Sequence, residues 1–195
     1  WRPANVPGTV HTDLISDKAI PDPFYRDNER KVQWVSNLDW EYKLDFQPDS
    51  TLLARPAVDL VFEGLDTYAS VYLNDSLIIS SSNMFLQHRK EVKRFLKSDQ
   101  NQILVVFRSP LKSALPELLA NPQILTATSD AMPLNTSPYS RKAGYHFGWD
   151  WGPRLVTSGI WRPVYIEGHD IASLEQVFLE TRSISGKNAK ISGRY

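Results

Sequence analysis

The segment Trp40-Glu41-Tyr42-Lys43-Leu44-Asp45-Phe46 has an aromatic or aliphatic side chain at every second position and a charged side chain at each position between. A period of two is typical of a β-strand that turns one face to a core and the other to water. The segment therefore predicts a half-buried strand, and similar patterns recur further along the chain.

Short apolar runs predict more strands, over residues 58–62, 69–73, 77–79, 103–107 and 160–166. Asn74-Asp75 separates two of these runs, and both residue types tolerate positive φ, so a tight hairpin is expected there. The run at 103–107 is almost entirely apolar, which predicts a central strand. Many short strands separated by turn residues predict an all-β fold, a jelly-roll β-sandwich with a few short helices.

Short helices are expected over residues 13–18, 91–97 and 113–119. Thr12 is the candidate N-cap of the first of these helices.

Asp66 follows Gly64, where we expect its carboxylate to satisfy a turn. Residues 122–144 are dense in Thr, Ser, Asn and Pro, and a loop of this length is usually functional or disordered.

Composition narrows the classes of function. The 195 residues carry 22 basic and 22 acidic side chains, so there is no electrostatic reason to expect a nucleic acid or an anionic membrane as partner. No apolar run approaches the ~18 residues of a membrane span. The chain has no cysteine, which excludes a disulfide scaffold, a Cys-ligated zinc site and a thiol nucleophile. The four histidines are scattered, so we expect no metal and no cofactor.

A domain boundary is expected near residue 168. A new alternation of Leu174, Val177 and Leu179 follows it, and the last strand pattern stops before its turn. We therefore expect one domain over residues 1–168 and the start of a second β-domain over residues 169–195. The chain is expected to be a piece of a longer protein.

The chemistry concentrates in residues 141–154, where Trp149 and Trp151 flank Asp150. An extended segment would place both indoles on one side and the carboxylate on the other, whereas a turn would let all three converge. Indole faces and a carboxylate suit a sugar site. The residues also allow a Trp-rich core, which composition alone favours slightly, in which Asp150 is satisfied by backbone N–H groups or by Arg141 or Arg154. Both interpretations remain open at this point.

Several short motifs lie along residues 1–168. They are Val6-Pro7-Gly8-Thr9-Val10-His11-Thr12-Asp13-Leu14, Asn28-Glu29-Arg30, Gln33-Trp34, Asp39-Trp40, Gly64-Leu65-Asp66-Thr67-Tyr68, Asn83-Met84-Phe85, His146, Trp149-Asp150-Trp151-Gly152-Pro153-Arg154 and Gly159-Ile160-Trp161-Arg162-Pro163-Val164. Together they resemble the N-terminal domain of β-mannosidases of glycoside hydrolase family 2. The Trp-Asp-Trp-Gly-Pro-Arg run is particular to the mannosidase branch.

The resemblance implies a galactose-binding-domain-like jelly roll, followed by an immunoglobulin-like β-domain and a (β/α)₈ catalytic barrel. It implies that Trp149, Asp150 and Trp151 bind the terminal, non-reducing mannose. A possible second tier of binding residues is Arg141, His146 and Arg154, although a histidine such as His146 is more often structural.

In the family, two glutamates on the barrel carry out a retaining hydrolysis, their carboxyl groups ~5–5.5 Å apart. No residue of this chain corresponds to either, so no catalytic residue is expected here. The implied partners are a β-mannoside oligosaccharide and the catalytic barrel and β-sandwich domains of the same protein. The implied location is exported or periplasmic in a bacterium, or lysosomal in an animal. The alternatives are a non-catalytic, lectin-like module, a purely structural domain, and the same domain of a β-galactosidase or β-glucuronidase.

Overall fold

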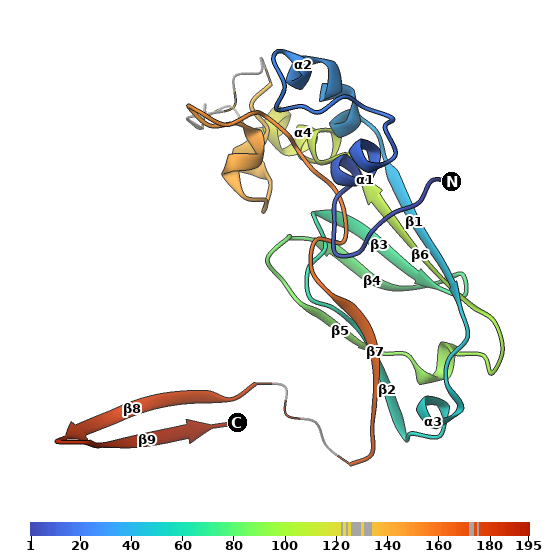
Figure 1. Ribbon diagram of the computed structural model, residues 1–195, viewed down its shortest axis with the longest axis vertical. Helices are drawn as coiled ribbons and strands as arrows, with labels where there is room; N and C mark the ends of the chain where they lie inside the picture. Colours follow the sequence, from blue (N-terminus) through green and yellow to red (C-terminus); the bar gives the residue numbers. More distant parts are fainter. Residues whose placement is uncertain (122, 124, 126–129, 131–133, 172–173, 175) are drawn as a thin grey trace.

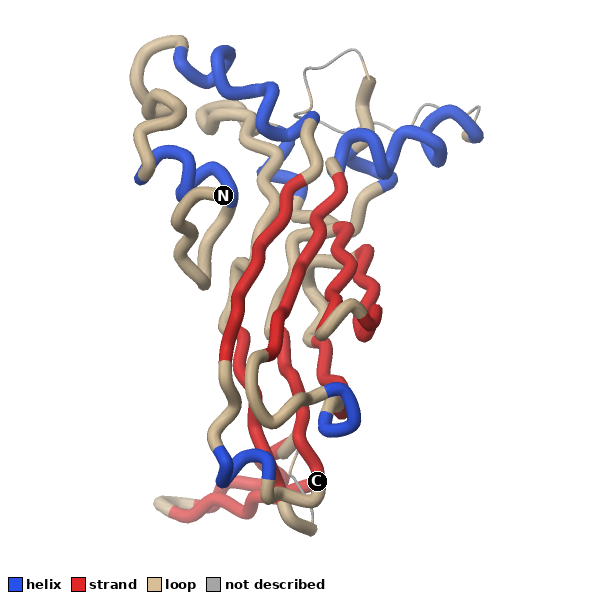
Figure 2. Tube along the Cα trace, turned by 90° about the vertical axis from the view of Figure 1, so that its right-hand side faces the viewer, coloured by secondary structure: helices blue, strands red, loops and turns tan. Residues whose placement is uncertain are grey.

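The computed structural model describes residues 1–195 except 122, 124, 126–129, 131–133, 172–173 and 175. Its helices are α1 (Val10–Ser16), α2 (Asn28–Val32), α3 (Ser50–Leu53) and α4 (Pro110–Ala120), with the 3₁₀ helices η1 (Gln33–Asn37), η2 (Lys93–Phe95), η3 (Ser137–Tyr139) and η4 (Gly144–Phe147). Its strands are β1 (Trp40–Phe46), β2 (Ala57–Phe62), β3 (Tyr68–Leu73), β4 (Ser76–Ser82), β5 (His88–Glu91), β6 (Asn101–Arg108), β7 (Val164–His169), β8 (Phe178–Ser185) and β9 (Asn188–Arg194). Most of the helical segments gather at one end of the strands (Figures 1 and 2).

Two antiparallel sheets face each other and form a sandwich. One has the strand order β1-β6-β3-β4 and the other the order β5-β2-β7. β6 is central, because its Val105 pairs with Tyr42 of β1 on one side and with Val71 of β3 on the other. The predicted all-β sandwich and the central strand at 103–107 are both confirmed.

The main core lies between the two sheets. Val71, Val105 and Phe107 project into it from one sheet, and Leu60 and Phe62 project from the other, all of them fully or almost fully buried. Buried residues recur at every second position in β3 and β6, whereas β2 is buried on both faces. The alternation that predicted the strands is thus the pattern of inward-facing residues.

A smaller apolar cluster joins the helical end to the sandwich. It contains Val10 and Leu14 of α1, Val32 of α2 and Val35 of η1, and Trp40 of β1 packs against it. The helical end is therefore fixed to the first sheet by a core of its own.

The predicted Asn74-Asp75 hairpin is confirmed between β3 and β4. Both residues adopt positive φ, 48° and 65°, as a two-residue hairpin turn requires. The Asn74 side chain donates to the Phe95 carbonyl at 2.7 Å and to Asn101 Oδ1 at 2.8 Å. These bonds hold the turn at the end of the sandwich opposite to Trp40, which pairs with the far end of β6.

α1 begins at Val10, so the prediction that Thr12 caps a helix over residues 13–18 is wrong. Thr9 is the N-cap, and its Oγ1 accepts from the N–H of Thr12 at 3.3 Å. The N–H of Thr9 donates in return to Thr12 Oγ1 at 3.0 Å. Two threonines three positions apart form this reciprocal pair, in which Thr12 takes the place usually held by Glu or Gln.

The strand predicted over residues 160–166 begins only at Val164. Pro163 has no N–H to contribute to a ladder, and its carbonyl accepts from the N–H of Glu63 at 3.0 Å. The indole of Trp161 turns aside and donates to the carbonyl of Met84 at 3.0 Å. The alternation predicts the side-chain directions in β7 correctly, but the pairing of β7 with β2 starts later than predicted.

The helix predicted over residues 113–119 lies wholly within α4, whereas the one predicted over residues 91–97 is reduced to a short 3₁₀ helix. α4 starts at Pro110, because the Ser109 hydroxyl caps it by accepting from the N–H of Lys112 at 3.3 Å. Only the short η2 forms within residues 91–97. Much of the loop expected over 122–144 lies outside the described residues, and its described part contains η3.

β8 and β9 form a two-stranded sheet that pairs with no other strand of the described residues. β7 of the sandwich runs to His169, which pairs with Ala57 of β2. The expected division near residue 168 thus falls at the end of β7.

Candidate functional site

The segment Trp149–Gly152 forms a tight turn. The N–H of Trp149 donates to the Gly152 carbonyl at 3.3 Å, and the N–H of Gly152 donates to the Trp149 carbonyl at 3.2 Å. Asp150 and Trp151 lie at its tip, and both are exposed. Gly148, at φ 105°, leads the chain from η4 into the turn through a conformation that only glycine adopts readily. Of the two conformations considered from the sequence, the chain adopts the turn.

The two indoles stand outside the core. Trp149 is 46% exposed and Trp151 is 85% exposed, which argues against a Trp-rich core as the role of this segment. Their ring centroids are 6.0 Å apart with an interplanar angle of 79°, an edge-to-face arrangement. The exposed carboxylate of Asp150 lies between them in the chain.

A hollow lies on each side of the turn. One, of about 640 Å³, is lined by the turn and by the loop and helix at Pro23, Phe24, Arg26, Glu29, Arg30 and Gln33. The other, of about 720 Å³, is lined by the turn and by Phe24, Tyr145, His146, Leu155 and Thr157. Phe24 borders both hollows and is 73% exposed, so it is a third aromatic side chain at the site.

The loop before α2 places Phe24. The N–H of Phe24 donates to Asp22 Oδ1 at 2.9 Å, and the Asn28 side chain donates to the Asp22 carbonyl at 3.0 Å. Arg26 has a φ of 55°, and its guanidinium lies 5.0 Å from the centre of the Tyr25 ring. Sequence reasoning missed Phe24, Arg26 and Arg30. The sequence does show two adjacent aromatic residues, Phe24 and Tyr25, directly after Pro23. No sequence pattern near them, however, predicts that their loop lies beside residue 150.

The Arg154 side chain has a structural role. Its side chain is 9% exposed, and its Nε donates to Asp130 Oδ1 at 3.0 Å. Its Nη1 donates to Gln33 Oε1 at 2.9 Å, and its main-chain N–H donates to Glu29 Oε1 at 2.8 Å. Arg154 therefore pairs with Asp130 rather than with Asp150.

The other two second-tier residues lie upstream of the turn. His146 of η4 is half-buried, lines one hollow and forms a hydrogen bond of 3.0 Å between its Nδ1 and Thr157 Oγ1. Burial, followed by the positive charge of Lys142, lowers the pKa of His146 to about 4, so the ring is neutral at pH 7. Arg141 is exposed, and its carbonyl accepts from the N–H of Met84 at 3.1 Å.

The arrangement suits binding of a sugar better than cleavage of one. Aromatic faces accept the C–H face of a pyranose, and an exposed carboxylate accepts hydroxyl protons in charge-assisted bonds. Glycoside hydrolysis needs two carboxyl groups about 5–9.5 Å apart across the bond. The other carboxylate of the hollow, Glu29, already accepts from Arg154. Within the described residues there is no cluster of three or more His, Asp or Glu side chains arranged for a metal ion.

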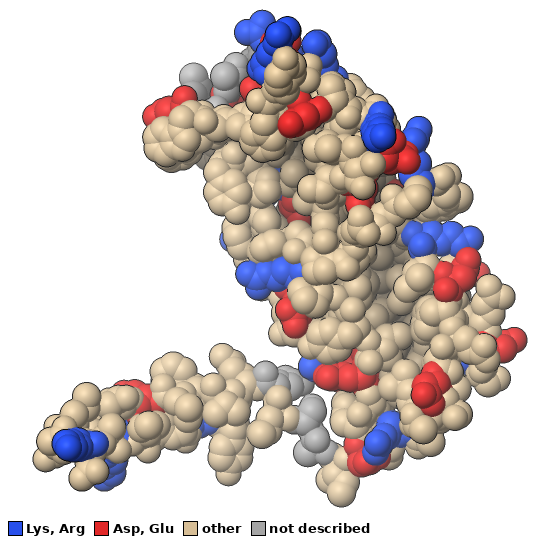
Figure 3. All heavy atoms as spheres, in the orientation of Figure 1, with Lys and Arg blue, Asp and Glu red and all other residues tan. Residues whose placement is uncertain are grey.

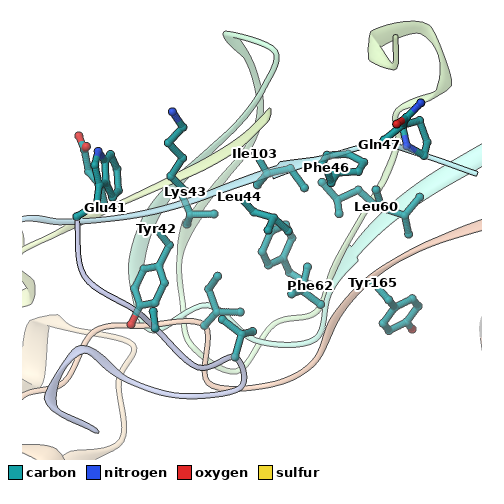
Figure 4. Close-up of a pocket in the computed structure, with 18 of the residues that line it drawn as sticks. Glu41, Tyr42, Lys43, Leu44, Phe46, Gln47, Leu60, Phe62, Ile103 and Tyr165 are labelled. Carbon is teal, nitrogen blue, oxygen red and sulfur yellow. The ribbon is translucent and has the colours of Figure 1, made fainter. Parts of the chain in front are cut away.

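A different cavity, of about 740 Å³, opens between the two sheets at β1 and β7 (Figure 4). Tyr42 points into it, whereas Glu41 and Lys43 point away from it. Its walls are largely apolar, with Phe46 and Phe62 among them. A sugar in this cavity would leave most of its hydroxyl groups unpaired, which is costly, so we do not assign it as the functional site.

Basic and acidic side chains are interspersed over the face seen in Figure 3. This distribution agrees with the zero net charge and gives no extended patch of one sign on that face. Among the described helices, none is both long and apolar enough to cross a membrane.

Residues 1–162 match the family model for the galactose-binding-domain-like domain of glycosyl hydrolase 2. The chain belongs to this family. This chain is 39% identical over 191 residues to beta-mannosidase B of Thermothelomyces thermophilus, an alignment that covers 95% of this chain and 22% of that protein. It is 40% identical over 169 residues to beta-mannosidase B of Aspergillus terreus, which covers 86% of this chain and 20% of that protein.

Comparison with solved structures supports the same family assignment. This chain superposes on a β-D-mannosidase from Dictyoglomus thermophilum with a TM-score of 0.90 and 41% identity, covering 98% of this chain and 23% of that one. An exo-chitosanase of Amycolatopsis orientalis gives a TM-score of 0.60 at 18% identity, covering 92% of this chain and 18% of that one, and so shows the fold alone. The domain spans about a fifth of the length of these relatives. The resemblance to β-mannosidase N-terminal domains is confirmed.

Proposed function

We propose that this domain is the N-terminal part of an exo-acting, retaining β-mannosidase, in which it supplies part of the binding site for the terminal, non-reducing β-D-mannose residue. The observation that carries the proposal is the exposed Trp149–Gly152 turn, which presents an exposed carboxylate between two exposed indoles. The similarity to proteins named β-mannosidases extends over nearly the whole chain and supports the choice of sugar.

Each residue of the turn has a distinct role in this proposal. Asp150 accepts protons from one or two mannose hydroxyls, and the ionised carboxylate makes these bonds about twice as strong as neutral ones. One indole, Trp149 or Trp151, forms a wall of the pocket against the C–H face of the ring. Neither role requires proton transfer, so the turn contributes binding and orientation.

The cleavage step belongs to other domains of the intact protein. In a retaining mechanism one glutamate attacks the anomeric carbon while a second protonates the leaving oxygen and later activates water. We place both glutamates on a catalytic barrel that follows this domain, and residues 169–195 at the start of an intervening β-domain. The exposed aromatics Phe24, Tyr145 and Trp151 form the face that meets the barrel.

The experiment compares the intact protein with its Asp150→Ala variant on aryl β-mannoside, β-galactoside and β-glucuronide. We expect cleavage of the mannoside alone. We also expect a fall in kcat/KM of about 10- to 100-fold in the variant, since one to two charge-assisted bonds are lost. The melting temperature should not change, because the Asp150 carboxylate is exposed.

Asp75→Asn is the matched control. It removes an exposed carboxylate from the β3–β4 turn at the other end of the sandwich, where Asn also tolerates the φ of 65°. Normal mannoside cleavage by Asp150→Ala would contradict the assigned role. Measurable mannose binding by these 195 residues in the absence of any hydrolase activity would favour the lectin-like alternative instead.

A further inference from the structure

The loop that carries the Trp149–Gly152 turn starts and ends at one buried ion pair. The Lys142 side chain is fully buried and that of Asp66 is 1% exposed, and Lys142 Nζ donates to both carboxylate oxygens at 2.5 Å. The same ammonium donates to the Thr157 carbonyl at 2.9 Å, fifteen positions further along the chain. The two ends of the loop therefore meet at a single charge.

Asp66 anchors this charge to the sandwich. Its N–H donates to the Gly159 carbonyl at 2.9 Å, and the N–H of Gly159 donates to the Asp66 carbonyl at 3.0 Å. The expectation that Asp66 merely satisfies the turn after Gly64 is wrong, because its carboxylate faces Lys142 and Thr157 in the interior. We refer to Lys142, Asp66 and Thr157 as the Lys142 cluster.

Proton counting extends the cluster to His146. The single hydroxyl proton of Thr157 is donated to Asp66 Oδ2 at 2.7 Å. The 3.0 Å contact between Thr157 Oγ1 and His146 Nδ1 then needs its proton from the imidazole. With Asp66 ionised, this counting predicts the Nδ1–H tautomer for neutral His146, whose ring lies in the wall of the hollow beside Trp149 and Trp151.

A buried lysine is a costly way to join two ends of a loop. An apolar pair of similar volume stabilises a core about as well as a buried ion pair, but it fixes no direction. Lys142 Nζ has four oxygen partners, the two carboxylate oxygens of Asp66 and the carbonyl and hydroxyl oxygens of Thr157. It therefore fixes the relative positions of three segments, because each hydrogen bond has a required geometry. The Trp149–Gly152 turn lies between two of those segments.

We propose that Lys142 is a positioning residue for the Trp149–Gly152 turn, acting by holding both ends of the loop to Asp66 and, through Thr157, orienting His146. The proposal rests on the proposed sugar-binding role of the turn for its biological meaning. The positioning itself is a physical property of the chain, and it can be measured without any sugar.

The test is hydrogen–deuterium exchange of peptides covering residues 143–156 in the intact protein, for wild type and Lys142→Met. Val71→Ala is the matched control, because it truncates a fully buried core residue outside the loop and lowers stability generally. We expect exchange in 143–156 to rise about tenfold or more in Lys142→Met relative to Val71→Ala, because the loop opens without the rest of the domain. Equal exchange in the two variants would overturn the proposal.

Lys142→Met leaves Asp66 as an unpaired buried charge, so a second variant separates positioning from stability. Lys142→Met with Asp66→Leu replaces the pair by apolar side chains and should recover the melting temperature. If Lys142 positions the turn, fast exchange in 143–156 persists in this double variant. If the pair is only structural, loop protection returns together with the melting temperature, and the proposal fails.

Kinetics separate this proposal from the proposed function. If the intact protein cleaves β-mannosides, kcat/KM of the double variant should fall about tenfold although its melting temperature is restored. If the protein cleaves no mannoside, the proposed function fails, while the exchange result still decides whether Lys142 positions the turn.

Discussion

The main-chain N–H of Arg154 donates to the carboxylate of Glu29 at 2.8 Å, across 125 positions of sequence. Gln33, four residues after Glu29, donates to the Arg154 carbonyl at 2.8 Å and accepts from its guanidinium at 2.9 Å. Two side chains from α2 and η1 thus pair with both main-chain groups of one residue. This fixes the C-terminal side of the Trp149–Gly152 turn to the helical end of the domain.

Glu29→Ala should destabilise the domain. It leaves the half-buried N–H of Arg154 without its acceptor, which costs about 1–3 kcal/mol in the free energy of unfolding. Glu29→Gln keeps an acceptor oxygen and should cost less than about 1 kcal/mol. Urea unfolding of the three proteins checks this, and equal losses in both variants would show that the negative charge matters rather than the hydrogen bond.

Gly148 and Gly144 make a matched pair around η4. Gly148 has a φ of 105°, so Gly148→Ala should cost about 1–3 kcal/mol of stability and reduce turnover of the intact protein. At Gly144 no heavy atom lies within 4 Å of an added Cβ, so Gly144→Ala should be neutral or slightly stabilising. Thermal unfolding of both variants checks this prediction. Backbone strain should destabilise Gly148→Ala alone, whereas a general intolerance of side chains in this loop would destabilise both variants.

Stability should fall on acidification because two histidines, the buried His11 and the half-buried His146, are neutral in the folded chain. Burial, followed by the charge of Lys142, lowers the pKa values of both His11 and His146 from the usual 6.5 to about 4. Between those pH values the unfolded chain binds protons that the folded chain does not, so the free energy of unfolding decreases as pH falls from 6.5 towards 4. Each histidine accounts for up to roughly 3 kcal/mol of this loss.

His11→Leu isolates one of the two groups. Neither ring nitrogen of His11 has a hydrogen-bond partner in the described part of the chain, so Leu should cost little or nothing at pH 7. We expect the stability of wild type relative to the variant to drop between pH 7 and pH 4.5, measured by urea unfolding at several pH values. Parallel pH curves for the two proteins would contradict the lowered pKa of His11.

The tautomer of His146 can be tested with two amide side chains. In His146→Asn the amide nitrogen can take the position of Nδ1 and still donate to Thr157, so stability should stay within about 1 kcal/mol of wild type. In His146→Gln the amide lies near the position of Nε2, and about 1–3 kcal/mol should be lost with the Thr157 bond. The reverse order of stability would contradict the Nδ1–H assignment.

Local sequence patterns were enough to predict most strands of the sandwich. The alternation over residues 40–46 and the Asn74-Asp75 turn identify their strands because side-chain direction and positive φ are set within a few residues. The start of β7 was placed too early, since the alternation includes Pro163 but Pro163 has no N–H to donate to a ladder. The Thr9 cap was missed because Thr9 and Thr12 are both suitable cap residues, and only the backbone conformation separates them.

The sequence predicted less of the candidate site than of the sandwich. Trp149, Asp150 and Trp151 were singled out by their types and by a family pattern. The pairing of Lys142 with Asp66 spans 76 positions, and neither residue carries a local sign of it. Phe24 reaches the site only because α2 packs against the end of the sandwich, so its place depends on tertiary contacts that no short motif contains.

The meeting of Lys142 and Thr157 at one carboxylate also has an evolutionary consequence. Because Lys142, Thr157 and Arg154 hold the segments on either side of the turn, its exposed tip residues, Asp150 and Trp151, can be replaced with little cost to the fold. The tip is therefore a variable part of an otherwise fixed loop. Related domains could change sugar preference by substitutions at these two positions alone, and such substitutions should keep the melting temperature.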